Sequence, residues 1–63
     1  MTAPNPMTIR LTRTAAGLSQ RQAAALIGLH VNSWHRWEAG ITKCHPDQFA
    51  RFCDLAQVRP VKA

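Results

Sequence analysis

The chain has 63 residues, with eight Lys and Arg against three Asp and Glu and a formal net charge of +5. This length allows one domain with one modest core. No apolar run reaches the roughly 18 residues that a membrane span requires, and the N-terminus lacks the features of a signal peptide. We therefore expect a cytoplasmic protein that has no membrane partner.

The charge is distributed unevenly along the chain. All three acids lie at or beyond Glu38, so the first 37 residues carry arginines and no carboxylate. Such a basic segment is typical of proteins that bind nucleic acid, but a basic surface with no specific partner has the same composition. Charge alone leaves both interpretations open.

The first helix is preceded by a proline-containing segment. Residues 1–6 contain two prolines and no apolar anchor, which predicts a disordered tail. A helix is expected from Thr8, as its N-cap, to Ala16, with Gly17 ending it. Its inner face is rather polar and consists of Ile9, Thr12, Arg13 and Ala16.

A second helix is expected over residues 20–27, because Ser19 is a good N-cap. Ala23 and Ala24 are small enough to let another helix approach closely. Gly28 can supply the left-handed residue of a tight turn. This pattern predicts two helices packed across a short turn.

The third helix is expected from His30 or Val31 to Ala39, and Gly40 ends it. Trp34 and Trp37 are three residues apart, so they share one face and are expected to pack in the core. Stacking of these rings on single-stranded bases is the less favoured alternative.

A fourth helix is expected to begin at Pro46, with Asp47 in its first turn. Cys44 and Cys53 are too few for a disulfide framework and are expected to be free thiols, Cys53 in the core. The apolar stripe of this fourth helix consists of Phe49, Phe52, Cys53 and Ala56.

Residues 59–63 are expected to form a basic tail, which leaves residues 7–58 as the domain. No stretch has a β pattern, so the predicted fold class is all-α, a compact bundle of four to five helices.

Several of these residues match one family at the right spacing. They are Arg13 four before Gly17, Leu18-Ser19-Gln20, Ala24, Gly28, Trp34 and Trp37-Glu38-x-Gly40. From Ile9 to Val58 the chain resembles the Cro/CI-type (XRE family) helix-turn-helix repressors of phages and bacteria, including small anti-CRISPR-associated regulators.

The resemblance implies a lambda-repressor-like bundle whose third helix is the DNA recognition helix. It also implies that Arg13 and Glu38 form a structural pair across the bundle. The chain departs from the pattern at two points: His30 replaces the usual Ser or Thr cap, and the fifth helix is truncated or missing.

The outer face of the third helix carries the predicted base contacts. Asn32 can form two hydrogen bonds with adenine, and Arg36 can form two with guanine. Val31 can contact a thymine methyl group, while Ser33 and His35 can contact bases or phosphate. An ordinary solvated helix face is the alternative.

Three further residues are predicted to contact the DNA backbone. Gln20 lies at the start of the second helix, where free N–H groups favour a phosphate. The resemblance implies that Gln20 also supports the recognition helix. Arg21 and Lys43 are candidate phosphate ligands, with plain surface charge as the alternative for each.

Metal and catalytic sites are not expected. A zinc site usually needs two pairs of ligands at matched spacing. No two such pairs occur among the candidate ligands, which are His30, His35, Cys44, His45 and Cys53. No nucleophile has a convincing base and orienting group, so we expect no enzyme activity, cofactor or small-molecule substrate.

Leu55 and Val58 fall off the main apolar stripe and are predicted to contribute to a two-fold dimer contact. The predicted function is a transcriptional repressor in a bacterial cytoplasm or nucleoid, binding an inverted-repeat operator as a homodimer. The resemblance adds autoregulation. An antitoxin-type protein-interaction module on the same fold is the main alternative, and an accessory protein that bends DNA is a third.

Overall fold

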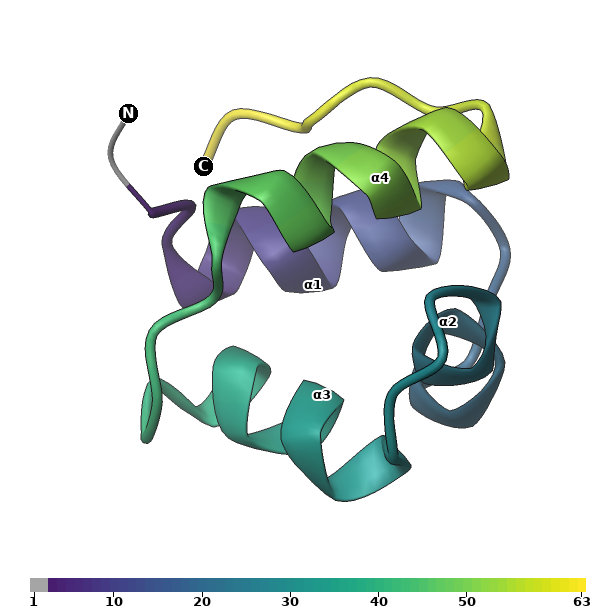
Figure 1. The fold of residues 1–63 in the computed structure, drawn as a ribbon. Helices are drawn as coiled ribbons and strands as arrows, with labels where there is room; N and C mark the ends of the chain where they lie inside the picture. The colour runs from purple at the N-terminus through teal and green to yellow at the C-terminus, as the bar shows by residue number, and fades with distance from the viewer. Residues whose placement is uncertain (1–2) are drawn as a thin grey trace.

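The computed structural model describes residues 3–63 and contains four helices joined by short turns (Figure 1). They are α1 (Pro6–Ala15), α2 (Gln20–Leu26), α3 (Val31–Ala39) and α4 (Pro46–Ala56). Residues 3–63 contain no strand, which confirms the predicted all-α class. Over the same residues, no helix is both long and apolar enough to cross a membrane.

Helix α1 begins earlier than predicted. Asn5, and not Thr8, is its N-cap: the Asn5 Oδ1 accepts a hydrogen bond from the Thr8 N–H at 2.7 Å. Pro6 occupies the first turn, where its fixed φ suits a helix and its missing N–H costs nothing. Residues 1 and 2 of the predicted tail lie outside the described residues, and the predicted domain boundaries stay a prediction.

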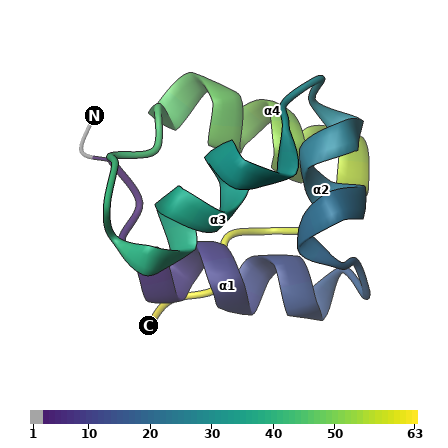
Figure 2. The ribbon, with the colours of Figure 1, turned by 90° about the horizontal axis from the view of Figure 1, so that it is seen from below.

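Both ends of α2 follow the predicted chemistry. Ser19 and Gln22 form a capping box, in which each side chain accepts a hydrogen bond from the other residue's backbone N–H. At the other end of α2, Gly28 has a φ of 71°, a left-handed conformation that glycine adopts without steric cost. Helix α3 therefore crosses α2 directly after a short turn, as Figure 2 shows.

The two tryptophans are in the core, as predicted. Trp34 is fully buried, and its ring meets Phe52 of α4 edge-on with centroids 4.7 Å apart. The Trp37 ring lies 5.4 Å from that of Trp34 and is also buried. The remaining members of the core are Ile9, Ala23, Ala24, Ile27, Cys44, Phe49 and Cys53.

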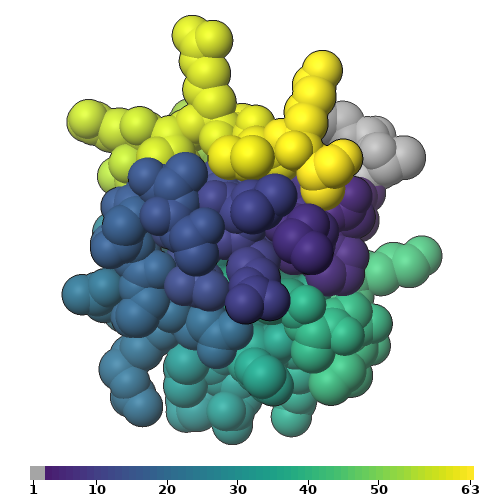
Figure 3. Space-filling view, turned by 180° about the vertical axis from the view of Figure 1, so that it is seen from behind, coloured from purple at the N-terminus to yellow at the C-terminus, as the bar shows by residue number. Residues whose placement is uncertain are grey.

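The segment after α4 folds back over α1. Gln57 adopts a left-handed conformation with φ 57°, which ends α4 and redirects the chain. In Figure 3 this C-terminal segment, in yellow, lies along α1, in purple. Figures 1 and 2 place it on the side of the bundle away from α3.

A buried hydroxyl joins this segment to α1. The Thr12 Oγ1 donates to the Thr8 carbonyl at 2.7 Å and accepts from the Val61 N–H at 2.9 Å. Thr12 is completely buried, so both bonds form away from water. This explains why a polar residue occupies the inner face of α1.

We expect Thr12→Val to lower the free energy of unfolding by about 1–3 kcal/mol, because the Val61 N–H loses its acceptor. Chemical denaturation with a fluorescence readout of the tryptophans measures this. Thr14→Val is the matched control, since within residues 3–63 the exposed Thr14 hydroxyl bonds only to carbonyls of its own helix. Equal stability changes in the two variants would contradict the role given to Thr12.

Candidate nucleic-acid interface

Helix α3 has one buried face and one polar exposed face. Trp34 and Trp37 point inward, so residues about 180° around the helix point to solvent. Among the predicted base contacts, Asn32, His35 and Arg36 are exposed, whereas Val31 and Ser33 are half-buried at the flanks. The structure thus presents an amide, an imidazole and a guanidinium together on the outside of one helix.

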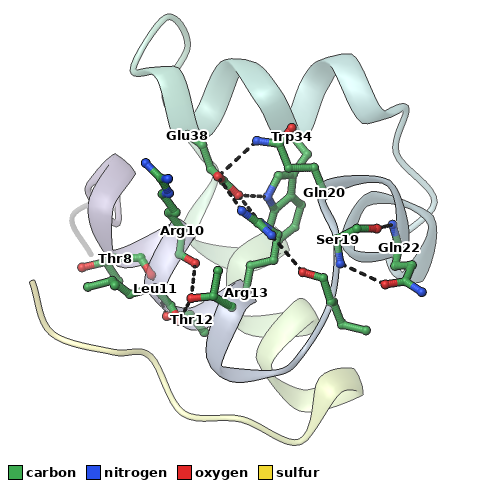
Figure 4. Close-up of polar contacts among 12 residues, drawn as sticks. Thr8, Arg10, Leu11, Thr12, Arg13, Ser19, Gln20, Gln22, Trp34 and Glu38 are labelled. Carbon is green, nitrogen blue, oxygen red and sulfur yellow. Dashed lines mark hydrogen bonds and ion pairs between the residues drawn. The ribbon is translucent and has the colours of Figure 1, made fainter.

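The orientation of α3 depends on the carboxylate of Glu38, shown in Figure 4. Arg13 of α1 donates to it twice, from Nε at 2.6 Å and from Nη2 at 3.1 Å. The Gln20 Nε2 of α2 donates at 3.1 Å, and the Trp34 Nε1 donates at 2.5 Å. Three helices therefore meet at one acid, and the Arg13–Glu38 pair implied by the resemblance is present.

Arg13 also closes the turn after α1. Its Nη1 donates to the Leu18 carbonyl at 2.9 Å, so one guanidinium joins the α1–α2 turn to α3. The side chains of Arg13 and Glu38 are only 13% and 6% exposed, which shields the pair from screening by water and salt.

Donors around Glu38 control its protonation. Burial alone would raise the pKa of Glu38, but hydrogen bonds from Arg13, Trp34 and Gln20 and the charge of Arg13 together lower that pKa below its ordinary value of 4.5. The carboxylate therefore stays ionised at neutral pH.

A hollow of about 270 Å³ lies along one flank of α3. Its lining includes Ser33 and Arg36 of α3 together with Lys43 from the loop that follows. The structure thus brings a predicted backbone contact, Lys43, next to two predicted base contacts.

A second hollow, of about 210 Å³, lies along the opposite flank. It brings His35 of α3 and Gln20 of α2 together with Arg10 of α1. The Arg10 side chain extends from α1 toward α3 (Figure 4). Sequence reasoning gave Arg10 no role, because the signal was only its place in a basic segment and not a motif.

Other predicted residues lie elsewhere. Arg21 is exposed on α2 and lines neither hollow. Leu55 is 49% exposed on α4, while Val58 is half-buried against the core. Their predicted roles in DNA backbone contact and dimerisation stay predictions.

The cysteines are free and buried, as predicted for Cys53. Burial raises the pKa of Cys44 to about 12, with a smaller effect from Cys53. Burial likewise raises the pKa of Cys53, helped by the charge of Asp54. Both thiols therefore stay protonated at neutral pH.

His30 caps α3 even though histidine is a weak capping residue. Its Nδ1 accepts a hydrogen bond from the Asn32 N–H at 3.1 Å. His45 holds the equivalent position before α4 and makes no such side-chain bond. The departure from the family pattern at residue 30 thus preserves the function of the usual cap.

The comparison with known families agrees with this geometry. A family model described as a helix-turn-helix domain matches residues 7–62. The chain belongs to this helix-turn-helix family. The helix-turn-helix pair is α2 and α3, and the domain is a DNA-binding one of the type found in regulators.

One curated relative matches part of this helix-turn-helix domain. Over 45 residues the chain is 33% identical to the Type II methyltransferase M.MspI of Moraxella sp. The match covers 71% of this chain but only 11% of that protein. The likeness therefore concerns one short region of a much longer enzyme.

We expect Glu38→Gln to destabilise the domain by about 3 kcal/mol, because it leaves the Arg13 guanidinium without its buried partner. The pKa of Glu38 is lowered by folding, so its contribution is fully present above pH 4.5 and disappears as the pH falls through the lower, folded-state value. Denaturation curves measured at several pH values should therefore show a weaker loss of stability on acidification in Glu38→Gln than in the wild type.

Asp54→Asn is the control for this experiment, because Asp54 is exposed on α4. It should retain the acid-dependent loss seen in the wild type. An unchanged pH dependence in Glu38→Gln would show that the carboxylate does not hold the three helices together.

Proposed function

We propose that the domain is a transcriptional repressor that binds an inverted-repeat DNA operator as a homodimer. The observation that carries the proposal is the two-faced α3, whose tryptophans anchor it while its amide, imidazole and guanidinium groups remain exposed. In this proposal α3 enters the major groove, where each base pair presents a distinct set of donors and acceptors. The role is binding without catalysis, and it requires no cofactor or metal.

Base recognition would come from the first two turns of α3. The exposed amide of Asn32 can pair with adenine and the exposed guanidinium of Arg36 with guanine, each through two hydrogen bonds. The half-buried Val31 would contact a thymine methyl group at the edge of the helix. Ser33 and His35 are the further candidates for contacts with bases or phosphate.

The two hollows would accommodate the phosphates on either side of α3. Lys43 lies on one flank, and Gln20 with Arg10 on the other, so both walls of the groove would meet donors. Arg21 would add a further contact to the backbone. Since the Gln20 Nε2 already donates to Glu38, Gln20 would link a phosphate contact to the orientation of α3.

We expect Asn32→Ala and Arg36→Ala each to weaken the free energy of binding to the operator by ~1–3 kcal/mol, because each removes two hydrogen bonds to one base. The preference for that base at its position in the operator should be lost. Binding should be measured by fluorescence anisotropy with the operator, its single-base variants and a scrambled duplex. Equal losses on operator and scrambled DNA would contradict base recognition by these residues.

Lys43→Ala provides the contrast in the same experiment. Loss of a phosphate contact should weaken binding to every duplex. It should also reduce by about one unit the slope of the logarithm of the binding constant against the logarithm of the salt concentration. Lys62→Ala is the matched control and should change neither quantity, because the C-terminal segment to which Lys62 belongs lies away from α3 (Figure 1).

Dimerisation would use Leu55 of α4 together with Val58, two residues beyond the end of that helix. We expect Leu55→Glu to shift the protein toward monomer in sedimentation velocity, because a buried charge without a partner opposes association. Met7→Glu is the control, since Met7 is 51% exposed and Leu55 is 49% exposed, but Met7 lies on α1. Identical sedimentation of the wild type and Leu55→Glu at all concentrations would exclude this surface.

A further inference from the structure

His30 lies at the start of the proposed recognition helix, and within residues 3–63 its side chain makes one hydrogen bond. Its Nδ1 accepts from the backbone N–H of Asn32, the residue proposed to contact adenine. A ring nitrogen can accept only when it carries no proton, so this bond requires a neutral ring with the proton on Nε2. The hydrogen bond thus selects one protonation state and one tautomer of His30.

The described residues provide few other groups that could stabilise the start of α3. Helix α3 has no acidic residue in its first turn that would favour its positive end. The acids of the chain are Glu38, which bonds to Arg13, Gln20 and Trp34, and Asp47 and Asp54, which lie on α4. Besides Glu38, the ionisable residues of the adjoining helices are Arg21 on α2 and His35 and Arg36 on α3. None of them hydrogen-bonds to the His30 ring in the described part of the chain.

We infer that His30 is a positioning residue for sequence recognition: its neutral ring holds the backbone of Asn32, so that this residue is already in its helical conformation when α3 enters the groove. The inference rests on the proposed function, since it concerns the same contact with DNA. A contact whose backbone is fixed in advance loses less conformational entropy on binding. His30 therefore acts on the preference for one sequence over another, through Asn32, and not only on stability.

Three variants test this. His30→Ala removes the acceptor, and His30→Ser restores one through its hydroxyl. Asn5→Ala removes a cap bond of similar kind from α1, away from the proposed base contacts. The probe is the tightest duplex selected from a random-sequence library, and the reference is a scrambled duplex of the same composition.

The measured quantity is the ratio of dissociation constants for scrambled and selected DNA. We expect His30→Ala to reduce this ratio about fivefold, equivalent to the ~1 kcal/mol typical of a lost cap. His30→Ser should stay near the wild-type ratio, and Asn5→Ala should lose stability but keep the ratio. If the ratio falls as far in His30→Ser as in His30→Ala, the ring itself contacts DNA and the positioning role is wrong.

A second measurement needs no variant. In native-state hydrogen exchange of the wild type, the backbone N–H of Asn32 should exchange more slowly than the backbone N–H of Val31. Of these two groups, it is the Asn32 N–H that bonds to the His30 ring. Equally fast exchange of the two amides would overturn the inference. A wild type with no preference for any sequence would instead overturn the proposed function, so the two failures are distinguishable.

Discussion

The carboxylate of Glu38 is the contact on which the arrangement of the first three helices depends. It accepts hydrogen bonds from Arg13 of α1, Gln20 of α2 and Trp34 of α3. A domain of this size buries little apolar surface, so an almost buried ion pair whose acid accepts from all three helices has a large influence. Because the acceptor belongs to α3, the network determines the orientation of the helix that we propose reads DNA.

The same network separates the two faces of α3. The indole N–H of Trp34 is satisfied internally, so the whole ring can be buried against Phe52. Within residues 3–63, the side chains of the polar residues on the other side make no hydrogen bond and are available to a ligand. His30 completes this division at the helix start, where its ring orders the backbone and leaves the Asn32 side chain exposed.

Local signals in the sequence predicted most of the helix ends. Ser19 and Gly28 mark α2 because capping and left-handed turns depend on residues a few positions apart. The Asn5-Pro6 start of α1 carried a similar signal, which was missed in favour of Thr8. The Arg13–Glu38 pair came only from the resemblance, since no local pattern joins residues 25 apart. The bond between Thr12 and Val61 spans 49 residues and likewise has no periodic signature.

In the proposed function, α3 reads a symmetric DNA sequence. Selection of bound duplexes from a random-sequence library with the purified protein tests it most directly. We expect an inverted repeat whose half-sites lie ~10 bp apart, centre to centre, because two recognition helices would lie on one face of the DNA. Recovery of duplexes with no shared sequence would contradict it.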